Sequence, residues 1–423
     1  MSDGADESRS LAPGFGWFWA SDGFSMASMQ LGMFLIPSVA AVVLRAPAAT
    51  VGAIYVAQTI PYAVVSPVAG ALVDRLGARR VIVAAHALRL IAATGLFFFS
   101  RDGALAWWSL AAFALTLGVG NATFDVAYQA AIPALVPADR LTLANSRLQT
   151  TGSVAAIVAQ PAAGILLERG GAGIAFLGMI ALVVASLALL APVLARLDHR
   201  AGARGSHSLR EAAGFIRSNP PLMRLFAVTS IANLGIALAA PAALLFYYRT
   251  LGLRPDAVGA LAAFALGGSL AAGMLAPRLL RRHGLQRALV ATSFTNAFGF
   301  LVLPLLAATS AVTAFTGSAA LALLRGMATT AYNVAQFSFR QQLVPLQMQG
   351  RVTGLARMLT WGTVPIGSAL SAVLLARFGI VAGIVAAGCV LAAAGIVACF
   401  AGARAPDEVS SSAHVPDPSK ART

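Results

Sequence analysis

The chain consists mainly of long apolar runs separated by short polar connections. A run of about 20 apolar residues is long enough for a helix to cross about 30 Å of hydrocarbon, and a helix satisfies its own backbone hydrogen bonds there. Twelve such runs are predicted, at residues 16–44, 50–73, 80–99, 104–130, 142–167, 172–195, 221–248, 255–277, 286–307, 311–338, 350–376 and 380–401. The pattern predicts an all-α membrane protein with twelve transmembrane helices. We expect no cleaved signal peptide, because the first run is too long and further spans follow it.

The polar segments divide the chain into two halves. Residues 1–15 and 402–423 are polar, and we expect both ends to be disordered. The longest connection, residues 196–220, separates two predicted six-helix bundles at 16–195 and 221–401.

The connection between the halves contains one amphipathic stretch. Its apolar residues recur at the spacing of a helix face, at Leu209, Ala212, Ala213 and Ile216. We therefore expect a short helix lying on the inner membrane surface.

An internal repeat relates the two halves. Residues 124–137 read FDVAYQAAIPALVP, and residues 332–345, which lie 208 positions later, read YNVAQFSFRQQLVP. Two similar halves around a shared midplane site are a common design of secondary transporters. The repeat predicts two pseudo-symmetric bundles.

Composition excludes an ordinary soluble domain. The chain is 58% hydrophobic and 11% charged, with a mean hydropathy of +0.79. The net charge is +15. If both termini are cytoplasmic, 22 of the 30 basic residues lie on the inner side, 6 lie outside, and Arg89 and Arg325 fall within spans. This asymmetry follows the positive-inside rule, so we expect the basic surface to face anionic lipid and not nucleic acid.

A basic motif joins the second and third runs. It reads GALVDRLGARR over residues 70–80 and combines Asp74 with three arginines. We expect both glycines to permit the turn and Asp125 to pair with Arg75 or Arg79. Such a cluster could hold one conformation and release in another; the alternative is ordinary interfacial charge that orients the loop. The hypothesised gate comprises Gly70, Asp74, Arg75, Gly77, Arg79, Arg80 and Asp125.

The second half carries a reduced copy of this motif. Pro277 stands in place of Asp74, and Asn333 stands 208 positions after Asp125. Because both acids are absent together, we infer that they serve one cluster.

The motif at residues 70–80 resembles the signature loop of the major facilitator superfamily, although Ala78 replaces a basic residue found in many members. Further stretches are similar to the drug-exporter branch, which includes enterobactin and macrolide exporters: residues 18–25, 87–89, 124–145, 208–220 and 251–259. The resemblance covers about residues 15–401 and implies a fold of two bundles that rock around a central cavity. It also implies that spans 1, 4, 7 and 10 line that cavity.

The tenth run carries a polar stripe. Steps of 3.6 residues place Ser318, Arg325, Thr329, Tyr332 and Gln336 on one helix face. An ionisable residue inside a membrane is costly and usually has a function. We predict that Arg325 contacts an anionic or carbonyl-bearing substrate or a counter-acid; the alternative is a buried arginine satisfied by helix carbonyls.

The first run carries a candidate proton site at Asp22. A carboxylate withdrawn from water can take up a proton, as proton-coupled exchange requires. Methionines form an adaptable apolar wall, and the neighbouring candidate substrate residues are Met26, Met29 and Gln30. Alternatively, Asp22 caps the helix or pairs with Arg89, and the methionines are core residues.

Other polar residues are assigned more simply. Asn233 in the seventh run is a candidate substrate contact, with helix packing as the alternative. We expect Arg89 to form a structural ion pair, His86 to be a packing residue, and Glu168 and Asp102 to be outer-loop charges.

Motifs of enzymes and cofactor sites were not found. The only lysine is Lys420, so no Walker A loop exists, and neither His-Glu-x-x-His nor Cys/His metal spacing occurs. We therefore expect no enzyme activity and no cofactor.

The sequence favours a monomeric secondary transporter of the bacterial inner membrane, with both termini cytoplasmic, which exports small apolar molecules by proton antiport. The alternatives are uptake of a small anionic nutrient and a membrane sensor or assembly protein that transports nothing.

Overall fold

The computed structural model describes residues 14–137, 140–198, 209–344 and 348–400, and the regular structure within them is helical throughout. The predicted disordered ends, apart from residues 14 and 15, and residues 199–208 of the connection lie outside the described residues.

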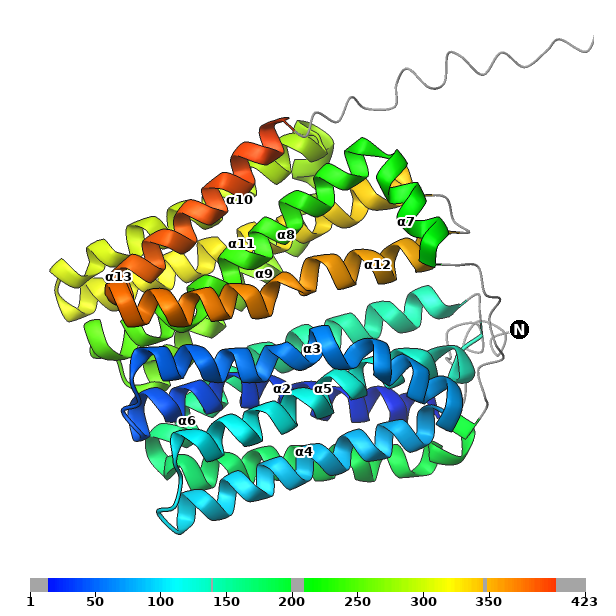
Figure 1. Cartoon of the computed structure of the whole chain (residues 1–423), viewed down its shortest axis with the longest axis horizontal. Helices are drawn as coiled ribbons and strands as arrows, with labels where there is room; N and C mark the ends of the chain where they lie inside the picture. Colours follow the sequence, from blue (N-terminus) through cyan, green and yellow to red (C-terminus); the bar gives the residue numbers. More distant parts are fainter. Residues whose placement is uncertain (1–13, 138–139, 199–208, 345–347, 401–423) are drawn as a thin grey trace, which may run out of the picture.

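The helices form two groups that follow chain order (Figure 1). The first group comprises α2 (Phe15–Ser38), the π-helix η1 (Val39–Val43), α3 (Ala48–Leu76), α4 (Ala78–Arg101), α5 (Trp107–Leu135), α6 (Leu141–Leu190) and the 3-10 helix η3 (Ala191–Asp198). The second comprises α8 (Pro220–Leu245), the π-helix η4 (Phe246–Thr250), α9 (Pro255–His283), α10 (Leu285–Val302), the 3-10 helix η5 (Leu303–Ala308), α11 (Ala311–Leu343), α12 (Gln349–Trp361) and α13 (Thr363–Phe400). The short helix α7 (Leu209–Ser218) lies beside the second group, where the sequence predicts an amphipathic helix.

Ten segments of the described chain are long and apolar enough to cross a membrane. Two of them, Thr150–Ala195 with 46 residues and Gly354–Phe400 with 47, exceed the length of one crossing. Each is interrupted by a glycine with non-helical torsion angles, Gly171 at φ 71° and Gly379 at φ 83°. Positive φ is accessible to glycine without steric cost, so each long segment is two helices joined at a kink.

Backbone features recur between the halves at nearly the same offset as the sequence repeat. Gly379 follows Gly171 by 208 residues, and the π-helix η4 begins 207 residues after η1. The junction between α3 and α4 at Gly77 (φ 83°) matches the junction between α9 and α10 at Gly284 (φ 78°). The duplication is therefore visible in backbone conformation as well as in sequence.

The basic motif is more helical than the sequence suggests. Helix α3 continues to Leu76, Gly77 alone breaks it, and α4 begins at Ala78. Gly70 lies inside α3 and has no neighbouring atom near its Cβ position. The expectation that both glycines permit the turn is wrong for Gly70, because the turn consists of a single residue.

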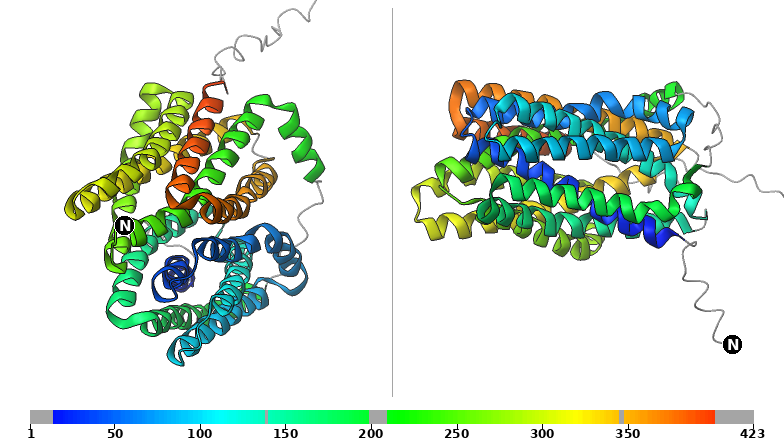
Figure 2. Two further views of the ribbon diagram at one scale, coloured as in Figure 1. Left: turned by 60° about the vertical axis from the view of Figure 1, so that its left-hand side comes forward. Right: turned by 90° about the horizontal axis from the view of Figure 1, so that it is seen from below.

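The two ends of the molecule are packed differently. We call the end with Gly77 and Gly284 the basic end, and the end with Gly171 and Gly379 the far end. The largest buried apolar cluster combines both groups and includes Leu35 and Ile36 of the first and Leu245 of the second. The other two clusters each belong to one group: one is built around Phe18 and Tyr128, and the other around Phe226 and Tyr332. Figure 1 shows α3 and α12 diverging toward the basic end, and the left view of Figure 2 shows the two groups from another side.

Glycines bring the two groups into backbone contact, chiefly in the half toward the far end. A Cβ on Gly164 of α6 would lie 2.3 Å from the carbonyl oxygen of Pro255 in α9. A Cβ on Gly52 of α3 would lie 2.7 Å from the Cα of Ala372 in α13. Such distances leave no room for a side chain, so these glycines set how closely the two groups approach.

We expect Gly164→Ala to force α6 and α9 apart, because overpacking of this kind costs about 1–3 kcal/mol. The measurement is the distance distribution between spin labels at Ala104 and Thr309, two exposed positions in far-end loops, with Cys389 and Cys399 replaced by alanine. The distribution should shift to longer distances.

Gly152→Ala is the matched control, because Gly152 lies in the same helix with open space at its Cβ position. It should leave the distances unchanged. Equal distributions for Gly164→Ala and the parent protein would contradict the steric account.

Candidate functional site

Polar contacts join the two groups at the far end. Arg254 Nε lies 2.7 Å from Glu168 Oε1, and the Tyr248 hydroxyl donates to Ser38 Oγ at 2.9 Å. Arg249 donates to the carbonyl oxygen of Ala46. The sequence interpretation of Glu168 as a loop charge is therefore incomplete, because it pairs with an arginine 86 residues away that no local spacing indicates. The Arg254 side chain is 68% exposed, and such pairs contribute at most about 1 kcal/mol.

A buried charge cluster lies inside the first group. Asp22 on α2 and Arg89 on α4 are only 3% and 1% exposed. Arg89 Nη1 donates to Ser25 Oγ at 2.6 Å, and Nη2 donates to the Ser25 carbonyl oxygen at 2.8 Å. Asp22 and Asp125 both lie within electrostatic range of Arg89. The guanidinium is thus held by hydrogen bonds to Ser25, and two acids lie within its electrostatic range.

Hydrogen bonds hold the helices around this cluster in place. His86 Nε2 lies 3.0 Å from Ser186 Oγ, and the hydroxyls of Ser21 and Ser186 each donate to the other residue's carbonyl oxygen at 2.8 Å. The Tyr128 hydroxyl donates to the carbonyl oxygen of Phe18 at 3.1 Å. These bonds connect α2 with α4, α5 and α6, so His86 is part of a polar network and not only a packing residue.

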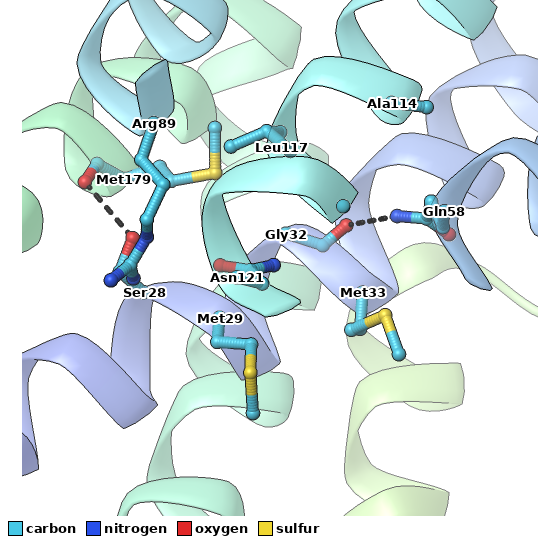
Figure 3. Close-up of a pocket in the computed structure, with 11 residues that line it drawn as sticks. Ser28, Met29, Gly32, Met33, Gln58, Arg89, Ala114, Leu117, Asn121 and Met179 are labelled. Carbon is cyan, nitrogen blue, oxygen red and sulfur yellow. Dashed lines mark hydrogen bonds between the residues drawn. The ribbon is translucent and has the colours of Figure 1, made fainter. Parts of the chain in front are cut away.

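A small cavity adjoins Arg89 (Figure 3). Its volume of about 10 Å³ is roughly that of one water molecule. Gln58 Nε2 donates to the carbonyl oxygen of Gly32 at 3.1 Å, while Gln58 Oε1 is buried without a hydrogen-bond partner in the described chain. Asn121 also lines the cavity. An unpaired buried carbonyl is costly, so this space suits a small hydrogen-bond donor.

The candidate substrate residues on α2 face two neighbours. Met29 Sδ accepts from the Tyr62 hydroxyl at 3.4 Å, and Figure 3 shows Met29 and Met33 projecting from the same side of α2. Gln30 accepts from Gln160 Nε2 on α6 at 3.2 Å. Met26 packs against the apolar cluster of the first group.

Arg325 lies inside the second group. Its Nη2 donates to the Tyr247 hydroxyl at 3.1 Å, and its Cζ lies 4.2 Å from the centre of the Phe300 ring, a favourable cation–π geometry. Gly299 makes room for the side chain, since a Cβ there would lie 2.6 Å from Arg325 Cγ. Arg325 Nε is buried without a partner in the described chain. The alternative drawn from the sequence is that helix carbonyls satisfy Arg325. In the structure a hydroxyl and an aromatic ring contact it instead.

The remainder of the α11 stripe contacts two helices. Thr329 bonds Asn296 on α10 at 3.3 Å, and the Tyr332 hydroxyl lies 2.9 Å from Thr229 Oγ1 on α8. Gln336 Oε1 accepts from Thr229 at 3.5 Å. Asn233 instead donates to the Thr360 carbonyl oxygen in α12 at 2.9 Å. The structure brings the stripe to α8 and α10, whereas the hydrogen bond of Asn233 goes to α12.

The hypothesised gate residues occupy two layers. Asp74, Arg75 and Arg80 are exposed at the basic end, and Arg79 is half-buried. Asp125 is half-buried on α5, within electrostatic range of Asp22. Asp125 therefore also interacts electrostatically with the buried cluster, a relation that the sequence does not indicate.

Comparison with known proteins shows the family. The sequence model of the Major Facilitator Superfamily matches residues 18–363. Macrolide efflux protein A of Enterococcus faecalis is 26% identical over 176 residues, which cover 41% of this chain. The match spans about half of that relative, 54% of its length.

Solved structures show the same fold. A bacterial homologue of the iron transporter ferroportin in an inward-facing state superposes with a TM-score of 0.73 at 17% identity, covering 94% of this chain and all of that one. A mutant of the nucleoside transporter NupG gives 0.68 at 15% identity, covering 91% of this chain and 98% of that one. The resemblance inferred from the basic motif is confirmed: the chain belongs to the Major Facilitator Superfamily and is a multi-pass membrane protein.

Proposed function

We propose that this transporter exports small, largely apolar molecules in exchange for protons, by alternating access between two six-helix bundles. The observation that carries alternating access is the unequal packing of the two ends: one core shared at the far end and two separate cores at the basic end. The macrolide efflux relative supports export of a natural product or drug.

The architecture supports this motion. With each of the two long segments counted as two helices, the ten candidate spans become twelve crossings, with bundles at 16–195 and 221–401. Each bundle has its own core at the basic end, so rocking would break only the contacts between bundles. Small rigid-body motions of this kind are common in switching proteins.

The distribution of positive charge supports an orientation. The basic end would face the cytoplasm, with both termini inside and the chain as a monomer in a bacterial inner membrane. The structure would then be in an inward-facing state. Asp74, Arg75, Arg79, Arg80 and Asp125 would form the inner gate, with Gly77 as its turn.

Asp22 is the proposed proton carrier. It is buried at the basic-end half of α2, and a protonated Asp22 would leave Arg89 with one neighbouring acid instead of two. Protonation would thus change the charge balance inside the first bundle, the kind of event that biases a two-state element. The proposed substrate contacts are Met26, Met29, Gln30, Asn233, Arg325, Thr329, Tyr332 and Gln336.

We expect Asp22→Asn to reduce proton-driven accumulation in inverted vesicles to the level of vesicles without the protein, because the amide cannot carry the proton. Counterflow exchange of labelled cargo, which requires no proton gradient, should continue. Asp102→Asn, at an exposed acid at the end of α4, is the control and should leave both assays unchanged. Proton-driven transport by the Asp22→Asn variant at the parental rate would refute the role.

One observation favours an anionic cargo as a second candidate. Within residues 209–400 the acids are Glu211 and Asp256 alone, so Arg325 has little opposite charge in its own bundle. A half-buried cation with few acids in its own bundle suits a ligand that carries the opposite charge.

Arg325→Gln separates the two cargo classes. For a neutral apolar cargo we expect KM to stay within about twofold, whereas loss of a charge-assisted hydrogen bond to an anion should raise KM about tenfold or more. The measurement is transport of a macrolide and of an organic anion by the same vesicles. Arg287→Gln, at an exposed position of the basic end, is the control. A tenfold rise in KM for the macrolide would contradict the neutral-cargo proposal.

A further inference from the structure

An apolar groove lies where the linker helix α7 meets the second bundle. It has a volume of about 400 Å³, within the range of small-molecule sites, about 300–1,000 Å³. Its walls come from three helices: Ile216 of α7, Met223 and Phe226 of α8, and Leu355 and Leu359 of α12. Phe226 and Ile216 are buried, whereas Met223 and Leu359 are about half exposed, so the groove has an apolar base and opens at its edges.

A capped junction produces the groove. Helix α7 ends at Ser218 and α8 begins at Pro220, and the side chain of Asn219 accepts a hydrogen bond from the Leu222 amide at 3.2 Å. This cap fixes the first turn of α8. The two helices separate from this point, and α12 closes the third side. The shape of the groove is therefore set by backbone structure.

In a bilayer, the groove would extend from the level of the lipid headgroups to the upper part of the acyl chains. The candidate membrane span of α8 begins at Pro220, and the lining residues Met223, Phe226 and Ser230 follow within about 5–15 Å at 1.5 Å per residue. Among the lining residues that the structure describes, only Arg217 is charged, and it is exposed on α7 just before the span begins. A cation thus stands at headgroup level above an apolar channel.

We propose that this groove binds one anionic phospholipid, with an acyl chain along α8 and α12 and the phosphate at Arg217. Charge complementarity selects this occupant, because the groove opens at the basic end beside the exposed cation Arg217. Basic residues near a membrane surface attract anionic headgroups. The apolar walls exclude a free phosphate as the main ligand, since they would then remain in contact with water.

The bound lipid would connect the linker to the moving bundle. Ser230 of α8 donates to the Leu359 carbonyl oxygen of α12 at 3.4 Å, and Trp361 of α12 lies 6.3 Å from Tyr62 of the first bundle, centre to centre. The groove therefore adjoins a helix that contacts the opposite bundle. Its occupancy would stabilise α7 and α12 in the arrangement seen here.

The test uses the full-length protein in nanodiscs that contain phosphatidylglycerol with a photoreactive diazirine on its acyl chain. Labelled peptides from α7, α8 and α12 are identified by mass spectrometry, and the same experiment is run with the phosphatidylcholine analogue. We expect labelling of the groove to be about fivefold stronger for phosphatidylglycerol, the factor expected for one arginine near the surface. Arg217→Gln should remove this preference, and Arg224→Gln should retain it.

Two tryptophan substitutions test separately whether an acyl chain occupies the groove. Leu359 lines the groove, whereas its neighbour Met358 is exposed outside it. Leu359→Trp should abolish groove labelling by both lipids, and Met358→Trp should not. Thermal stability of each variant is measured alongside, so that an unfolded variant is recognised and replaced by Ala227→Phe, which fills the same groove.

Three results would overturn the proposal: equal labelling by the two lipids, labelling that is unchanged by Leu359→Trp, or displacement of the lipid label by a macrolide, which would assign the groove to cargo. The experiment includes no transport measurement. Its failure is therefore distinguishable from failure of the proposed export function.

Discussion

The contact between the two bundles toward the far end is the constraint on which the rest of the structure depends. Gly164 and Gly52 let backbones of opposite bundles touch, and a shared apolar core surrounds the contact. The ion pair between Glu168 and Arg254 adds little because it is largely exposed. Packing thus determines which end is closed, and the ion pair makes only a small further contribution to that closure. A transporter closed by packing can open without separating strongly bound ions.

Arg89, which is buried, and Arg325, which is half-buried, are accommodated by similar means in the two bundles. Arg89 lies against Gly120 and over the Phe124 ring, and Arg325 lies against Gly299 and over the Phe300 ring. Each donates to a hydroxyl on the first membrane span of its own bundle, Ser25 in one and Tyr247 in the other. Nearby acids distinguish them, because two acids of the first bundle lie within electrostatic range of Arg89. This difference is why we assign proton coupling to the first bundle and leave Arg325 available for cargo.

Apolar periodicity and the 208-residue repeat predict the helical class and the approximate positions of the spans, and the motif at residues 70–80 indicates the family. They could not predict that Gly77 alone forms the turn, because φ depends on how α3 and α4 pack. The pairs Glu168–Arg254 and Arg325–Tyr247 were missed for a related reason: their members are far apart in sequence, and only tertiary packing brings them together. The sequence predicts that the polar residues of α11 lie on one side of the helix. Only the structure shows which helices these residues contact.

The most direct test of alternating access is simultaneous measurement of both ends in one membrane sample. Spin labels at Leu76 and His283 report the basic end, and labels at Ala104 and Thr309 report the far end. With a proton gradient and cargo present, the account predicts that the basic-end distance shortens while the far-end distance lengthens. A far-end distance that stays fixed while cargo is transported, or two distances that change together in the same direction, would contradict it.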